Sequence, residues 1–363
     1  MPYHRNPALQ NQMLPVDIVL GPPWWYHHAG ITFDEDCFYH PARRVEVERK
    51  MEDVLYERWG QYGLGESHGQ SLPVVGPVHL AAGYLISEML GCRVDYLPDC
   101  PPQVKPLNLD RLEISPDSAF QSPAFKRTEK LFDALRERHG GLLGDINWGG
   151  VINVALDLRG AAIFLDMYDR SDEVHRFLGQ IAEVMDRFTQ MVCHATGTTS
   201  ITGNRNVRHI AEPVFLHCEC ANVMISTDDW EKYFMPFDVE WSRKHRPFGI
   251  HYCGKDPHRY AESFAKLPHL DFLDVGWGGD VALLRKHLSD TFLNVRLSPV
   301  DICKQSPDEV RRTVRRLVHD SGNPYLTGVC CINMDQDVAD EQVAAIFDEV
   351  ETLRREYAAM ETA

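Results

Sequence analysis

Short apolar runs alternate with longer amphipathic stretches through most of the chain. This alternation is typical of strand and helix units repeated around a parallel sheet. The runs expected to form strands span residues 143–147, 249–252, 272–275, 294–297 and 325–328. The pattern predicts an α/β protein, specifically a (β/α)8 TIM barrel with an N-terminal extension.

Three of the intervening stretches carry clear helix signals. After Ser171, apolar residues recur at steps of three and four, which places one apolar stripe against a core. A second helix is expected at Ser306-Pro307-Asp308-Glu309, where Ser caps, Pro takes the first turn and Glu closes a capping box. A third helix is predicted from about Asp340 onward.

No Gly/Ser/Pro linker divides the chain convincingly, so a single domain over 1–363 is expected. Within it, residues 1–75 are interpreted as an N-terminal extension that closes the pocket, and residues 76–355 as the barrel. The best linker candidate, residues 100–116, is interpreted as a long loop.

Composition restricts the class of protein. The chain has 363 residues, of which 44% are hydrophobic and 25% charged, as in ordinary globular proteins. A net charge of −16 argues against nucleic acid or an anionic membrane as the main partner. The ten cysteines are irregularly spaced, and the N-terminus lacks the apolar core of a signal peptide, so we expect reduced thiols in a cytoplasmic protein.

The segment His251-Tyr252-Cys253-Gly254 directly follows an apolar run and offers two soft metal ligands. Side chains two positions apart on a strand share a face, so the imidazole and the thiolate can hold one ion. Further along, the apolar run from residue 324 ends in Cys330-Cys331. Only one of these two can face the metal, and Cys330 is favoured while Cys331 is expected to be a core thiol. Three soft ligands with one open position are typical of catalytic zinc.

Two further groups belong to the same region. Asp274 ends the next predicted strand, and its alternatives are a fourth ligand, a partner of the imidazole, or a cap for the glycine-rich loop that follows. The segment His217-Cys218-Glu219-Cys220 is a rival ligand-rich cluster. We interpret Glu219 and Cys220 as pocket residues, with a purely structural role equally open.

The order of these elements resembles the C-terminal half of the uroporphyrinogen decarboxylase superfamily. It is most similar to the zinc-dependent methyltransferase branch, which includes coenzyme M methyltransferases and, more distantly, cobalamin-independent methionine synthase. In that branch a His-x-Cys pair and a distant Cys bind a zinc ion that activates a thiol to receive a methyl group. The resemblance implies Zn²⁺ on His251, Cys253 and Cys330.

The N-terminal half adds to this resemblance. Residues 23–31 are similar to the decarboxylase signature, but His27 and Ile31 stand where that family has two arginines. Arginine pairs with carboxylate in a bidentate manner, so these changes argue against a polyanionic tetrapyrrole substrate. Aromatic and polar side chains are expected to line the pocket here, although packing in the barrel mouth is the simpler alternative. These residues are Trp24, His27, His28, Asn147 and Trp148.

The resulting hypothesis is a zinc-dependent methyltransferase that moves a methyl group between a small methylated compound or thiol and a corrinoid protein. The corrinoid is expected on a separate partner, because no Asp-x-His-x-x-Gly motif occurs and the nearest match, from Asp256, has Ala261 in place of Gly. A metal-assisted decarboxylase or lyase of a small acid is the alternative, and a binding protein with a structural ion is a third reading. A homodimer is left open.

Overall fold

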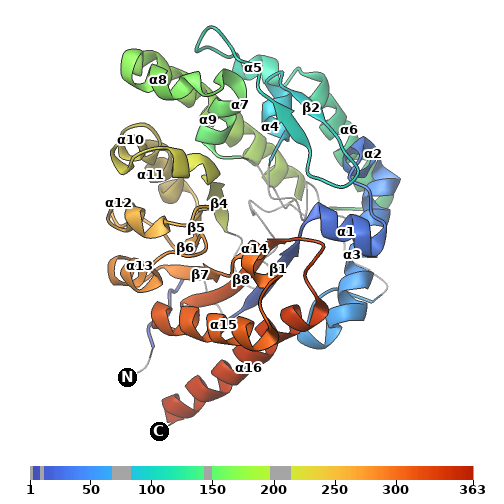
Figure 1. Cartoon of the computed structure of the whole chain (residues 1–363). Coiled ribbons are helices and arrows are strands. Elements are labelled where there is room, and N and C mark those ends of the chain that lie inside the picture. Colours follow the sequence, from blue (N-terminus) through green and yellow to red (C-terminus); the bar gives the residue numbers. More distant parts are fainter. Residues whose placement is uncertain (1–2, 9–11, 68–82, 143–148, 197–213, 363) are drawn as a thin grey trace.

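Six parallel strands form one curled sheet in the computed structural model, which describes residues 3–8, 12–67, 83–142, 149–196 and 214–362 (Figure 1). The strands are β1 (Val16–Leu20), β4 (Phe215–Cys218), β5 (Phe248–His251), β6 (Phe272–Asp274), β7 (Phe292–Arg296) and β8 (Thr327–Met334). Their order across the sheet is β1-β8-β7-β6-β5-β4. The first strand of the chain therefore lies beside the last, as a barrel sheet requires.

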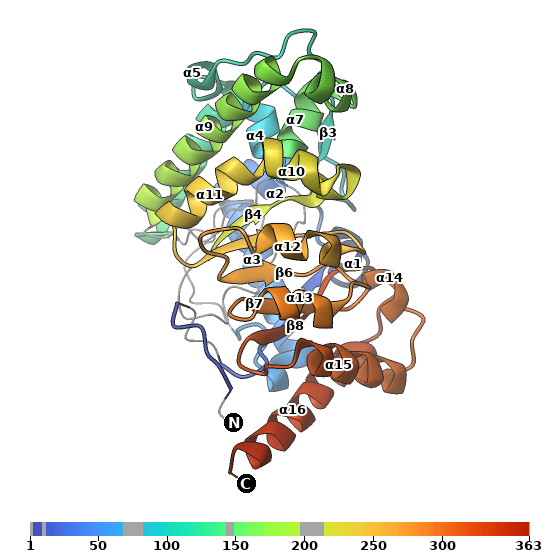
Figure 2. The ribbon, with the colours of Figure 1, turned by 90° about the vertical axis from the view of Figure 1, so that its left-hand side faces the viewer.

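Helices cover the outer side of this sheet and build the N-terminal half of the molecule (Figure 2). The helices before β4 are α1 (Pro22–Ala29), α2 (Glu35–Tyr39), α3 (Pro41–Trp59), α4 (Leu85–Met89), α5 (Pro116–Ala119), α6 (Pro123–His139), α7 (Val151–Arg159), α8 (Ala162–Asp169) and α9 (Ser171–Thr196). Those after β4 are α10 (Thr227–Tyr233), α11 (Met235–Lys244), α12 (Ala261–Phe264), α13 (Val281–His287), α14 (Pro299–Ile302), α15 (Pro307–Ser321) and α16 (Asp340–Thr362).

Short elements complete the described part of the chain. These are the 3-10 turns η1 (Gly60–Tyr62), η3 (Cys220–Met224) and η4 (Pro257–Tyr260), and the antiparallel pair β2 (Arg93–Asp95) and β3 (Gln103–Lys105). The last of these lies inside the segment predicted to be a long loop, so that loop contains one brief strand.

The predicted pattern of strands and helices is confirmed over the second half of the chain. Strands lie at all four predicted positions after residue 248, and helices begin at Ser171, Pro307 and Asp340. The capping box is present, because the Ser306 side chain accepts from the Glu309 N–H and the Glu309 carboxylate accepts from the Ser306 N–H. The predicted strand 143–147 lies outside the described residues.

The fold is thus α/β with a curled parallel sheet, and closure into eight strands stays a prediction. The segment interpreted as an N-terminal extension contributes β1 to this sheet, where Val16 is paired with Val329. The sheet therefore draws strands from both sides of the predicted boundary at residue 75, while the single-domain organisation stays a prediction.

Burial explains why the strand sequences are mostly apolar and do not alternate regularly with polar residues. Every residue of β1, β4, β5, β6 and β7 is buried. Such burial on both faces is expected when helices cover the outer side of a parallel sheet and side chains fill its inner side. The few polar residues on these strands are consequently costly, and each needs a partner or a function.

Candidate metal centre

A row of functional side chains crosses the sheet at one level. The parallel register pairs Cys218 with His251, His251 with Asp274, and Asp274 with Asn294. Register partners on neighbouring strands project to the same side of a sheet, and the C-terminal ends of these strands are where such folds place their chemistry. The strand order therefore brings His251 and Asp274 side by side.

A compact group of soft ligands lies at this edge. The Sγ of Cys253 is 2.7 Å from Nε2 of His251 and 3.1 Å from the Sγ of Cys220. The ligand atoms of Cys220, His251 and Cys253 all lie within 4.8 Å of one another. His251 is buried, whereas Cys220 and Cys253 are partly buried residues.

Asp274 fixes the orientation of the His251 ring. Its Oδ2 lies 2.5 Å from Nδ1 of His251, which makes Nδ1 the protonated nitrogen and turns Nε2 toward the sulfurs. A carboxylate behind a ligating histidine is the usual way in which proteins set the tautomer and raise ligand basicity. This contact favours the second of the three predicted roles of Asp274, that of a partner of the imidazole.

The charges in this group stabilise one thiolate. A hydrogen bond from Cys220, with His251 and Arg296 close by, lowers the pKa of the Cys253 thiol well below its ordinary value, although burial acts in the opposite direction. The same hydrogen bond, together with burial, raises the pKa of Cys220. Burial alone would lower the pKa of His251, but the negative charges of Cys253 and Asp274 raise it to about 10. Cys253 is therefore the thiolate of the pair and Cys220 the donor.

Arg296 brings a buried positive charge to the same place. Its Nη1 is 4.0 Å from the Sγ of Cys253, and its guanidinium lies over the Trp277 ring at 5.2 Å. The side chain is almost completely buried, and its Nε has no hydrogen-bond partner in the described structure. Sequence reasoning placed Arg296 on a strand but gave it no role; a charged residue within an apolar predicted strand was the available signal.

The two cysteines of β8 lie on opposite faces of the strand. Cys330 faces the inner side, with Val19 and Ile332, and its Sγ is 3.7 Å from Oδ1 of Asp274. Cys331 is buried in the main hydrophobic core. The structure thus places Cys330 behind Asp274 and outside the compact group of Cys220, His251 and Cys253. Its role as a ligand stays a prediction.

A second buried cluster, which we call the carboxylate cluster, consists of His217, Glu219 and Asp238. Nδ1 of His217 lies 2.7 Å from Oδ1 of Asp238, and its Nε2 accepts the N–H of Val151 at 3.3 Å. Glu219 accepts hydrogen bonds from the side chains of Trp230 and Asn222. Both nitrogens of His217 are therefore engaged within the protein.

Burial favours the uncharged forms of the residues in the carboxylate cluster. Desolvation, together with the nearby Asp238, raises the pKa of Glu219 to about 8. Burial also raises the pKa of Asp238 and lowers that of His217. Glu219 thus adjoins Cys220 in sequence but belongs to the carboxylate cluster. Its contact with a substrate stays a prediction.

The predicted aromatic pocket residues lie on α1, directly after β1. Trp24 is fully buried, stacks on His28 at 4.7 Å between ring centroids, and packs against Trp59. His27 and His28 are exposed, and Nε2 of His28 lies 2.8 Å from the carbonyl oxygen of Gln336. Their role in a pocket stays a prediction.

Two of the predicted pocket residues, Asn147 and Trp148, lie outside the described residues.

None of the described helices is long and apolar enough to cross a membrane.

Two solved structures share this fold with the chain. A methyltransferase from Methanosarcina mazei has a TM-score of 0.65 and 13% identity over 94% of this chain and 95% of that chain. A B12-independent methionine synthase from Shewanella sp. W3-18-1, solved in complex with selenomethionine, has a TM-score of 0.55 and 11% identity over 96% of this chain and 100% of that chain. No protein-family model and no curated protein matches the sequence. At these identities the likeness establishes the fold alone, which is the fold of both methyltransferases.

Proposed function

We propose that the chain is a zinc-dependent methyltransferase that moves a methyl group between a small methylated compound or thiol and a corrinoid carried by a separate protein. The observation that carries the proposal is the convergence of His251 Nε2 and the Cys253 thiolate at the C-terminal edge of the sheet. Support comes from the fold, which two methyltransferases share. A shared fold is consistent with this chemistry but does not by itself assign it.

The donor set fits zinc. A carboxylate holds Nδ1 of His251, and a thiolate lies beside Nε2. This arrangement of histidine, carboxylate and thiolate is common at zinc sites. The predicted ligands are His251, Cys253 and Cys330. When bound there, zinc would supply Lewis acidity that deprotonates a substrate thiol at neutral pH while leaving it nucleophilic.

The protein's own residues prepare this site in three ways. Asp274 keeps the proton on Nδ1 of His251, so that Nε2 stays available as a ligand. Arg296 balances the negative charge of Cys253 at the buried side of the group. The strand ends beside the group are buried, which excludes water from that side.

The first test combines metal content with activity. Purified protein should contain about one zinc per chain, and it should demethylate free methylcobalamin in the presence of a small thiol, followed by the visible spectrum of the corrinoid. Cys253→Ala should lose both properties. A protein that retains zinc but does not consume methylcobalamin or a methylated corrinoid protein with any of a panel of thiols would contradict the assignment.

A lyase or decarboxylase of a small acid is a second candidate, and one observation favours it. The buried guanidinium of Arg296 has an unpartnered Nε close to the proposed metal position, and guanidinium groups pair well with carboxylates. Release of CO₂ from small carboxylic acids by the zinc-loaded protein, with no turnover of methylcobalamin, would favour this candidate.

A further inference from the structure

The sulfur of Cys220 lies closer to the proposed metal position than that of Cys330. Cys220 was interpreted from the sequence as a pocket residue, yet its Sγ is 3.1 Å from the Sγ of Cys253. Among the described residues, Cys220 belongs to the group of ligand atoms within 4.8 Å of one another, and Cys330 does not.

We propose that Cys220 is itself a ligand of the metal, together with His251 and Cys253. This inference rests on the proposed function, because it assigns a residue to the same zinc site. It adds a ligand from the end of β4 to a site otherwise built from β5 and the last strand.

The observed distances are close to those of a loaded site. With zinc bonds of about 2.3 Å to sulfur and about 2.0 Å to nitrogen, tetrahedral ligands lie about 3.8 Å apart for two sulfurs and about 3.5 Å apart for sulfur and nitrogen. The separations of 3.1 Å between Cys220 and Cys253, and 2.7 Å between Cys253 and His251, are shorter by less than an ångström. Small rotations about side-chain bonds would open the group to that size.

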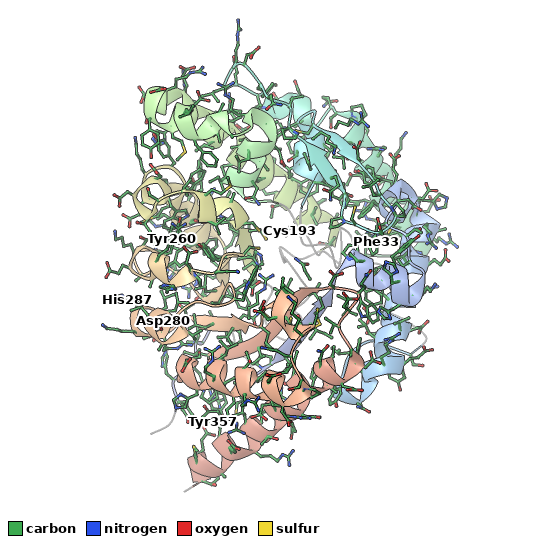
Figure 3. All side chains as sticks on the ribbon, in the orientation of Figure 1. Phe33, Cys193, Tyr260, Asp280, His287 and Tyr357 are labelled. Carbon is green, nitrogen blue, oxygen red and sulfur yellow. The ribbon has the colours of Figure 1, made fainter. Side chains whose placement is uncertain are left out.

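The backbone holds Cys220 in this position. It is the first residue of η3, where the N–H of Ala221 donates to Asn153 at 2.9 Å. The carbonyl of Asn222 accepts from the Tyr260 hydroxyl at 2.8 Å and from Arg259 at 2.6 Å (Tyr260 is labelled in Figure 3). A ligand on a segment fixed by its own hydrogen bonds loses little conformational freedom when it binds a metal.

The charge around the site suits an additional thiolate. Zinc with one neutral imidazole and two thiolates is uncharged, and a third thiolate gives a net charge of −1. Arg296 supplies one buried positive charge with its Nη1 at 4.0 Å from Cys253 and its Nε unpartnered. A buried charge of one sign is tolerated where a charge of the opposite sign lies beside it.

The matched control is Cys218, two residues earlier on β4. Its thiol is fully buried and donates to the carbonyl of Leu216 at 3.9 Å, and it is not part of the ligand group. Removing it changes the cysteine count and the packing of the same strand but leaves the proposed ligands in place.

The test replaces zinc by Co²⁺ in the reduced protein. The absorbance of the thiolate-to-Co²⁺ charge-transfer band increases with the number of coordinating sulfurs. Cys220→Ala should lose roughly a third to a half of that absorbance and bind Zn²⁺ at least about tenfold more weakly in competition with a chromophoric chelator. Cys218→Ala should match the unmodified protein in both measurements. Cys220→Ser, checked by circular dichroism, separates loss of a ligand from loss of the fold.

Full thiolate absorbance and unchanged zinc affinity in folded Cys220→Ala would overturn the inference. If the same preparation loses its metal on replacement of Cys253, the zinc site of the proposed function survives that result. If the unmodified protein binds neither Zn²⁺ nor Co²⁺, the proposed function fails and this inference fails with it.

Discussion

Two buried histidines on neighbouring strands have opposite relations to their surroundings. His217 on β4 and His251 on β5 both place Nδ1 against an aspartate, at 2.7 Å and 2.5 Å. Nε2 of His217 accepts a backbone N–H, whereas Nε2 of His251 faces the sulfur of Cys253. Both nitrogens of the His217 ring are therefore used by the fold, whereas the His251 ring directs Nε2 toward soft ligands.

The difference shows that a cluster of ligand-type residues is not enough to define a metal site. His217, Glu219 and Asp238 lie as close together as the sulfur group does. Their burial favours uncharged forms and internal hydrogen bonds, while a hydrogen bond from Cys220 and the positive charges of His251 and Arg296 lower the pKa of Cys253. We therefore expect the metal at the sulfur group and a purely structural role for the carboxylate cluster.

The largest expected effect is on metal content. Cys253→Ala removes the thiolate nearest to His251 and should abolish stoichiometric zinc in a folded protein. Asp238→Asn, which alters the other cluster by a comparable amount, should leave zinc unchanged. Metal analysis of both variants checks the comparison, and loss of zinc from the Asp238 variant would reverse our assignment.

Asp274→Asn should have the next largest effect. The amide lacks the negative charge that supports His251, so we expect zinc to bind about 10–100-fold more weakly. Titration with a competing chelator measures this loss. An unchanged affinity would mean that Asp274 does not orient the ring for metal binding.

His217→Ala should affect stability and not metal binding. The change leaves the N–H of Val151 and the side chain of Asp238 without this partner, which should lower the free energy of unfolding by about 1–3 kcal/mol. Urea denaturation of the metal-free protein gives the value. A weaker zinc affinity in this variant would show that the two clusters act together.

The last effect concerns pH. The carboxyl of Glu219 has its pKa raised from 4.5 to about 8, so it contributes stability fully below pH 4.5 and loses that contribution as the pH rises through 8. Glu219→Gln stays neutral and should lack this part of the pH dependence, while keeping the acceptor for Trp230. Denaturation at several pH values between 5 and 8 compares the two proteins. Parallel curves would show that Glu219 ionises normally.

The strands and helices of the C-terminal half could be predicted from the sequence. The strands are almost completely buried and therefore form apolar runs, and the helix caps are formed by residues close together in the sequence. The apolar run before His251 became β5, and the Ser306 capping box starts α15 as expected. The strand β1 was missed, since its short run Val16–Leu20 lies within the segment that was interpreted as an extension. Its pairing with β8 depends on contacts across the whole chain, which no local pattern encodes.

The site was predicted in part for similar reasons. His251 and Cys253 come together because they lie two positions apart where β5 ends, a geometry that the sequence specifies. Cys220 was recognised as part of a ligand-rich segment, but it begins the 3-10 turn η3, where strand alternation no longer applies. The orientation of Asp274 toward His251 required the register of β5 and β6.

The loops that carry these residues pack closely because two of them have a glycine at the point of contact. A Cβ built on Gly276 would lie 1.8 Å from the carbonyl oxygen of Gly254, and one on Gly254 would lie 2.4 Å from a methyl group of Val223. The spacing between the sulfur of Cys220 and that of Cys253 therefore depends on Gly254, whose missing side chain lets the second loop pack closely against Val223. Transplanting any one of these loops into another barrel would carry the cysteine but not its position, so the segments after β4, β5 and β6 form the smallest transferable unit.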